Sequence, residues 1–120
     1  QDLAGKWSAS DDPLHFDQQS TLPGPWNTYL ARRKIKIAAM HQGKNVVFHW
    51  EGTGPIEGIV FNGRYIRRLH YHIGNSFDIN LTPYVHYGAD NEMEIVRGGG
   101  KGEATIDRCS LDFYESADYP

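Results

Sequence analysis

Apolar and polar residues alternate with a period of two wherever this sequence is regular. In residues 44–51, the large apolar side chains of Val46, Phe48 and Trp50 fall on one face of an extended chain, and residues 33–39 repeat the pattern. Because successive side chains of a β-strand point to opposite faces, this spacing predicts strands with one buried face. No window carries an apolar stripe with the 3.6-residue period of a helix, so we expect almost no helix.

Turn signals separate these alternating segments at short intervals. Asn62-Gly63 is the strongest of them and predicts a hairpin. Residues 41–44 are expected to join the strands on either side of them as a second hairpin, and residues 82–85 to form one short helical turn. The last strand is expected over residues 104–114. About eight short strands with turns between them predict an all-β chain, a single antiparallel β-sandwich domain over residues 1–120.

Composition excludes several classes of function. A chain of 120 residues is long enough for one domain, and no run of about 18 apolar residues is present to span a membrane. With 12 basic and 15 acidic residues, the net charge of −3 provides no attraction to nucleic acid or an anionic membrane. The single cysteine, Cys109, excludes an internal disulfide and a zinc site built on cysteines, and its apolar surroundings predict a buried side chain.

Four stretches of the sequence, in this order, resemble segments of a known family. They are Leu3–Trp7, Leu22–Trp26, the pair Phe48–Gly52 and Ile59–Gly63, and the pair Phe77–Asn80 and Gly88–Ile95. Their order and spacing resemble the sugar-binding β-jelly-roll domain that opens glycoside hydrolase family 2 enzymes and, more broadly, the galactose-binding-domain-like superfamily. The resemblance extends over about residues 3–97. It implies a jelly-roll sandwich and a carbohydrate context.

The sequence also departs from that family in ways that bear on function. The stretch between Trp26 and Arg33 is shorter than the family's insertion, and residues 67–74 replace the family's Gly-x-His-x-Gly-Gly. The catalytic barrel of the family 2 enzymes, which holds their acid and nucleophile, has no counterpart in this sequence. The resemblance therefore implies an architecture without implying catalysis. Some domains of the superfamily carry a structural calcium ion, but no cluster of oxygen ligands stands out here, and we expect no cofactor and no metal.

Glycosidase chemistry needs two carboxyl groups about 5–9.5 Å apart. Glu51 and Glu57 come nearest to this requirement, since they lie on adjoining predicted strands. Glu51 occupies the family's glutamate position, which the resemblance implies is structural. We therefore predict no catalytic residue.

His70 and His72 share one face of an extended segment, a spacing that metals can use. A third ligand would have to come from His86, His15 or Asp78. Nothing in the sequence requires such a ligand, and we interpret the two histidines as solvent-facing side chains of a polar loop.

Sugars bind where aromatic rings stack on their apolar faces and planar polar groups donate and accept hydrogen bonds. Trp7 and Trp50 match core positions, whereas Trp26 follows Pro-Gly-Pro and is expected either to pack in the core or to contact a ligand. Residues 65–75 gather aromatic, basic and amide side chains on a loop, where binding residues are common; a solvated edge kept from aggregating by basic side chains is the alternative. The predicted ligand-binding residues are Trp26, Tyr65, Arg67, Tyr71, His72 and Asn75, and Tyr84, His86 and Tyr87 form a second, weaker patch.

These features favour a non-catalytic carbohydrate-binding or accessory module associated with glycan degradation. Its expected partners are an oligo- or polysaccharide and a catalytic glycoside hydrolase domain, with no nucleic acid and no membrane. Because the sequence starts at Gln1 without a signal peptide, we expect a secreted, periplasmic or cell-surface protein whose signal peptide has been removed. A structural or protein-interaction domain without sugar binding is the alternative, and a small independent glycan hydrolase is the third.

Overall fold

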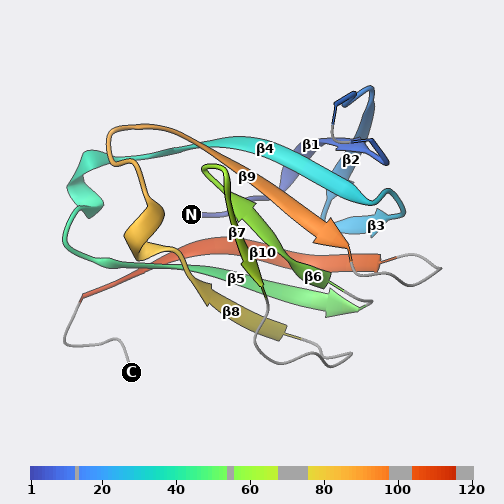
Figure 1. The fold of residues 1–120 in the computed structure, drawn as a ribbon. Coiled ribbons are helices and arrows are strands. Elements are labelled where there is room, and N and C mark those ends of the chain that lie inside the picture. The colour runs from blue at the N-terminus through green and yellow to red at the C-terminus, as the bar shows by residue number, and fades with distance from the viewer. Residues whose placement is uncertain (13, 54–55, 68–75, 98–103, 116–120) are drawn as a thin grey trace.

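Two antiparallel sheets pack face to face in the computed structural model (Figure 1). It describes residues 1–12, 14–53, 56–67, 76–97 and 104–115. The larger sheet has the strand order β2-β1-β4-β9-β6-β7: Gln18–Leu22, Gly5–Ser10, Leu30–Ile37, Ala89–Arg97, Ile56–Phe61 and Arg64–Arg67. The smaller sheet has the order β3-β10-β5-β8: Gly24–Trp26, Ala104–Tyr114, Asn45–Thr53 and Ser76–Asn80. The predicted all-β sandwich is confirmed.

The described residues form ten strands, where the sequence predicted about eight. The segment around Gln18–Leu22 shows no strong alternation because β2 is an edge strand whose side chains are mostly exposed. β3 is only three residues long and pairs with the first residues of β10. Two 3-10 turns, η1 (Ala39–His41) and η2 (Thr82–Tyr84), complete the described elements, and η2 confirms the predicted helical turn. None of the described helices is long and apolar enough to cross a membrane.

The core lies between the sheets and is built from the alternating positions. Val46, Phe48 and Trp50 of β5 are fully buried, and Trp7 and Trp26 are each 1% exposed. Burying an aromatic or large aliphatic side chain stabilises a fold by about 1.5–3 kcal/mol, so the inward faces of these strands account for the main stabilising term. Cys109 is buried in the same cluster, as predicted.

The predicted hairpin at residues 41–44 is wrong. β4 pairs with β1 and β9, whereas β5 pairs with β10 and β8, so η1 and the residues after it carry the chain from one sheet to the other. Alternation tells which face of a strand is buried, but it does not tell which strand lies beside it. The Asn62-Gly63 hairpin is confirmed: both residues have positive φ angles, 49° and 80°, and Phe61 of β6 faces Arg64 of β7.

Strand β10 connects several parts of the smaller sheet. It spans the predicted residues 104–114 and pairs with β5 along most of its length, with a bulge between Ile106 and Arg108. At this bulge, a Cβ atom on Gly52 of β5 would lie 2.0 Å from the Thr105 carbonyl oxygen. Position 52 is thus closed to every side chain. Beyond the bulge, the N–H of Leu3 donates to the Cys109 carbonyl at 3.0 Å, so the first residues lie along β10.

Candidate functional site

The predicted ligand-binding residues do not gather in one place. Trp26 is on β3, at the edge of the smaller sheet that contacts β2. Tyr65 and Arg67 are on β7, which is the opposite edge of the larger sheet from β2. Tyr65 is 43% exposed and lies opposite Val60 of β6. The remaining three, Tyr71, His72 and Asn75, lie outside the described residues.

Trp26 is held firmly by its polar edge. Its Nε1–H donates to the Thr28 hydroxyl at 2.7 Å, and that hydroxyl donates to the Leu30 carbonyl at 2.9 Å. With the ring 1% exposed, this bonding favours the packing role that the sequence left open for Trp26.

A pocket of about 360 Å³ nevertheless reaches Trp26 between the edges of β2 and β3. Its volume is at the lower end of the range of small-molecule sites. The lining of this pocket, called the Trp26 pocket below, is Gln19, Ser20, Thr21, Pro25, Trp26 and Asn27. Two amides and two hydroxyls can each donate and accept hydrogen bonds, as sugar hydroxyls do, and none of the six residues is charged. Gln19 and Asn27 were not predicted from the sequence, because nothing in the sequence distinguishes them from other exposed polar residues of the surface.

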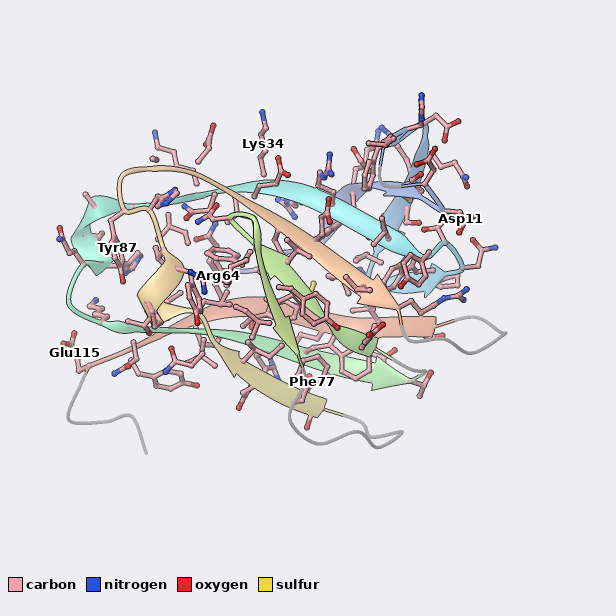
Figure 2. The ribbon with its side chains drawn as sticks, in the orientation of Figure 1. Asp11, Lys34, Arg64, Phe77, Tyr87 and Glu115 are labelled. Carbon is pink, nitrogen blue, oxygen red and sulfur yellow. The ribbon has the colours of Figure 1, made fainter. Side chains whose placement is uncertain are left out.

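The second predicted patch contains a smaller pocket of about 180 Å³ at the turn end of β7. Arg64 lies over the Tyr84 ring, 5.4 Å from its centroid, and Figure 2 shows Arg64 beside η2. The lining of this Arg64 pocket is Phe61, Asn62, Arg64, Pro83, Tyr84, Val85 and His86. Two of the three residues of the second predicted patch, Tyr84 and His86, therefore line one pocket, which also includes Arg64 and Asn62, whereas Tyr87 packs against the core.

Two asparagine side chains hold the backbone of this pocket in place. The side-chain N–H groups of Asn62 donate to the Tyr84 carbonyl at 2.8 Å and to Asn91 Oδ1 at 2.7 Å. Asn91 is 1% exposed; its Oδ1 accepts the His86 N–H at 2.8 Å and its Nδ2 donates to the His86 carbonyl at 2.9 Å. The spacing of Asn91 from Met93 and Ile95 puts it on the buried face of β9.

Among the carboxylates, Glu51 is on β5 and Glu57 is on β6, in different sheets. Glu51 instead flanks His49, whose other ring nitrogen, Nδ1, lies 2.5 Å from Asp78 Oδ1 on β8. Burial lowers the pKa of His49, but the hydrogen bonds and negative charges of Asp78 and Glu51 outweigh it, and the pKa is raised above its usual 6.5.

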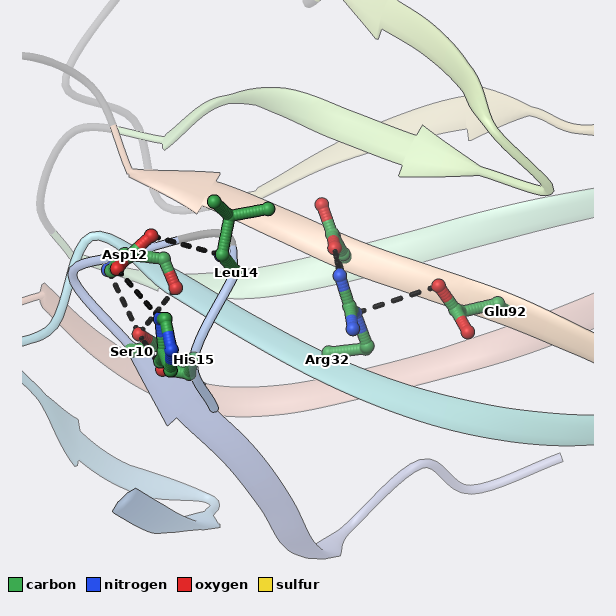
Figure 3. Close-up of polar contacts among 7 residues, drawn as sticks. Ser10, Asp12, Leu14, His15, Arg32 and Glu92 are labelled. Atoms are coloured by element: carbon green, nitrogen blue, oxygen red, sulfur yellow. Dashed lines mark hydrogen bonds and ion pairs between the residues drawn. The ribbon is translucent and has the colours of Figure 1, made fainter. Parts of the chain in front are cut away.

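Histidine and carboxylate side chains of the described residues form no cluster of three that could hold a metal ion. His15 pairs with Asp12 inside the turn that also holds Ser10 and Leu14 (Figure 3). The backbone N–H of Leu14 and then the His15 ring lower the pKa of Asp12. His70 and His72 lie outside the described residues.

A cavity of about 460 Å³ lies between the first residues of the chain and β10. Its charged lining is Asp2, Asp107, Arg108 and Asp112. Cys109 also lines it, but burial raises the pKa of this thiol to about 12. The thiol is therefore protonated at neutral pH and is not a nucleophile.

The outer face of the larger sheet is covered by charges of both signs. Arg32 lies between Glu92 and Glu94, and Figure 3 shows its contact with Glu92. Its guanidinium is 3.9 Å from the centre of the Phe16 ring. Lys34, two residues along β4, points away from the sandwich (Figure 2).

No protein-family model matches this chain, and no curated protein has a significantly similar sequence. The fold, in contrast, recurs in solved glycosidases. A β-D-glucuronidase from Dictyoglomus thermophilum matches 97% of this chain with a TM-score of 0.77 and 13% identity. A glycosyl hydrolase family 2 member from Bacteroides cellulosilyticus matches 96% with a TM-score of 0.71 and 19% identity, and a Lactobacillus rhamnosus β-glucuronidase matches 90% with a TM-score of 0.70 and 17% identity.

The match covers only part of each of these proteins: 28% of the first chain, 20% of the second and 25% of the third. This chain therefore spans less than a third of their length. At identities this low, the matches establish the fold alone. They confirm that the predicted sandwich is one found within family 2 glycosidases.

Proposed function

We propose that this chain is a non-catalytic accessory domain of glycan degradation that binds carbohydrate, as part of a glycoside hydrolase or beside one. The observation that carries the proposal is the fold itself, which matches nearly the whole of this chain to a minor segment of much longer glycosidases. A domain of this kind supports an enzyme by holding its substrate or by packing against its catalytic domain. Export from the cytoplasm remains a prediction from the sequence.

The Trp26 pocket is the part of the described surface that best fits an uncharged sugar. Its size admits one ring, its amides and hydroxyls match sugar hydroxyls, and Pro25 and the edge of Trp26 supply an apolar wall. Tyr65, on β7 at the far edge of the larger sheet, is proposed as a second contact, and Arg67, Tyr71, His72 and Asn75 stay binding residues predicted from the sequence.

Retardation in native gels that contain soluble polysaccharides tests the proposal. Asn27→Ala and Gln19→Ala each remove one planar amide from the pocket rim and should weaken binding about fivefold, the effect of one hydrogen bond of about 1 kcal/mol. Gln18→Ala is the matched control, because Gln18 is equally exposed on β2 but does not line the pocket. Trp26→Ala is unsuitable as a test, since it would leave a large cavity in the core.

The β7 surface is tested in the same gels. Tyr65→Ala should weaken retardation without lowering the melting temperature by more than a few degrees, because the ring is 43% exposed. If the wild-type protein migrates unretarded through a broad panel of glycans, carbohydrate binding is refuted. The chain would then be a structural domain that packs against a catalytic one.

A further inference from the structure

The Arg64 pocket contains a positive charge that the described part of the chain leaves uncompensated. Arg64 is exposed, and its guanidinium contacts the Tyr84 ring but forms no ion pair with any described carboxylate. Arg32, by contrast, pairs with two glutamates, and Arg33 donates to the carbonyls of Leu3 and Ala4.

The nearby acid is directed elsewhere. Glu92 donates its backbone N–H to Asn62 Oδ1 at 2.9 Å, which places its main chain at the pocket, but its carboxylate lies 3.4 Å from Arg32 Nε. The polar groups of Asn62 are also occupied, since its amide donates twice and accepts once. Arg64 and the exposed His86 are thus the basic groups of the pocket available to a ligand.

The shape of the pocket is set before any ligand arrives. Asn62 and Asn91 fix the backbone from Tyr84 to His86, and the Tyr84 ring supports the guanidinium of Arg64 from one side. Because these groups are already held in place, little conformational entropy of the protein is lost when a ligand binds. The remaining wall is apolar, made by Phe61, Pro83 and Val85.

From this geometry we propose that the Arg64 pocket binds the carboxylate of a small molecule, with the Arg64 guanidinium as the main donor and the His86 ring as the second. A guanidinium presents two parallel N–H groups at the spacing of carboxylate oxygens, which makes the pair both strong and directional. The volume of about 180 Å³ leaves room for a ligand larger than the carboxylate itself. This site goes beyond the proposed function and does not depend on it, because the Trp26 pocket is separate and uncharged.

Amide chemical-shift titration of the intact chain with D-glucuronate tests this inference, with D-glucose as the neutral partner of the same ring size and acetate as the bare carboxylate. Saturable shifts are expected at residues 61–64 and 84–86 with glucuronate, with at least tenfold weaker binding of glucose. Arg64→Gln should weaken the binding of glucuronate at least tenfold. Arg108→Gln, which removes an exposed arginine of β10, is the matched control and should leave the binding unchanged.

Each outcome decides the question. Glucuronate shifts that survive Arg64→Gln, equal shifts with glucose, or no saturable shifts would overturn the proposal. If acetate binds as tightly as glucuronate, the proposal is supported and the carboxylate alone accounts for the affinity. If glucuronate binds more tightly than acetate, the proposal is supported and the sugar ring also contributes to the affinity. Because Arg64 is exposed, the variant is expected to fold, and an unchanged melting temperature verifies that.

Discussion

Asn62 and Asn91 are bonded side chain to side chain, with Asn62 Nδ2 donating to Asn91 Oδ1 at 2.7 Å. The bond joins the tip of the β6–β7 hairpin to the buried face of β9, and both amides reach on to the backbone of residues 84–86. Three segments distant in sequence are thereby locked together through two amides. Asn62, which forms the turn of the β6–β7 hairpin, thus also makes a tertiary contact.

Asn91→Ala should lower the free energy of unfolding by about 2–4 kcal/mol, because the His86 N–H and the Asn62 amide lose a buried acceptor. Urea unfolding followed by circular dichroism measures the loss. The exposed Asn27→Ala provides the comparison and should stay within about 0.5 kcal/mol of the wild type. Equal effects of the two substitutions would contradict the structural role given to Asn91.

Two of the three tryptophans, Trp26 and Trp50, differ in how their indole N–H groups are satisfied. Trp26 donates to Thr28, whereas the buried Nε1 of Trp50 has no hydrogen-bond partner among the described residues. Both Trp→Phe changes lose similar apolar volume, but only Trp26→Phe also breaks a hydrogen bond. We expect Trp50→Phe to be less destabilising than Trp26→Phe by about 1 kcal/mol in urea unfolding. The reverse order would mean that Trp50 is bonded elsewhere in the chain.

Two glycines are required for different reasons. Gly52→Ala would drive a Cβ into the Thr105 carbonyl and should cost about 4 kcal/mol or more, since β5 and β10 must separate. At Gly63, with φ of 80°, a Cβ meets nothing within 4 Å, so Gly63→Ala should cost only about 1 kcal/mol of backbone strain. Thermal unfolding of both variants gives the comparison, and a mild effect at position 52 would place the bulge elsewhere.

Cys109 should be inert while the protein is folded. Burial raises the pKa of its thiol to about 12, so at pH 8 the native protein should resist iodoacetamide, and the label should appear by mass spectrometry only in denaturant. Stoichiometric labelling of the native protein at pH 8 would show that the β10 face opens readily.

His49 makes stability depend on pH in a defined direction. Its pKa in the folded protein is raised above 6.5, so its stabilising contact with Asp78 is fully present below about pH 6.5 and is lost as the pH rises through the raised pKa. Because Asp78 is exposed, the contribution is about 0.2–1 kcal/mol. Asp78→Asn should therefore lower the melting temperature at pH 6 and have little effect at pH 9. A difference that is constant across this range would exclude the contact.

Local patterns predicted most of the strands, because the alternation of apolar and polar residues in a segment shows which of its side chains are buried. Residues 104–114 and the Asn62-Gly63 turn show this. They could not predict partners: the loop at residues 41–44 has the composition of a hairpin but connects the two sheets, since the pairing of β4 and β5 is decided by distant strands. The number of short strands and turns predicted the sandwich, and the family resemblance pointed to the same architecture.

The candidate sites were less predictable for a related reason. Trp26 was selected because it follows Pro-Gly-Pro, but as part of β3 its ring is buried in the core, with polar neighbours such as Gln19 at the rim of the pocket. Arg64 was not singled out, because only the folded chain shows that its charge has no described partner while that of Arg32 does. Charge compensation is a property of the tertiary structure.

The paired charges on β4 and β9 have a consequence for long-range attraction. Arg32, Lys34 and Lys36 lie opposite Glu94, Glu92 and Asp90, so each of these three cations has an anion across the ladder. At distances beyond about 10 Å in physiological salt, such neighbouring opposite charges cancel, and the face neither draws nor repels an ionic solute. An acidic molecule that approaches the domain therefore gains no attraction from these paired charges, whereas Arg64, at the tip of the β6–β7 hairpin, has no such anion beside it among the described residues.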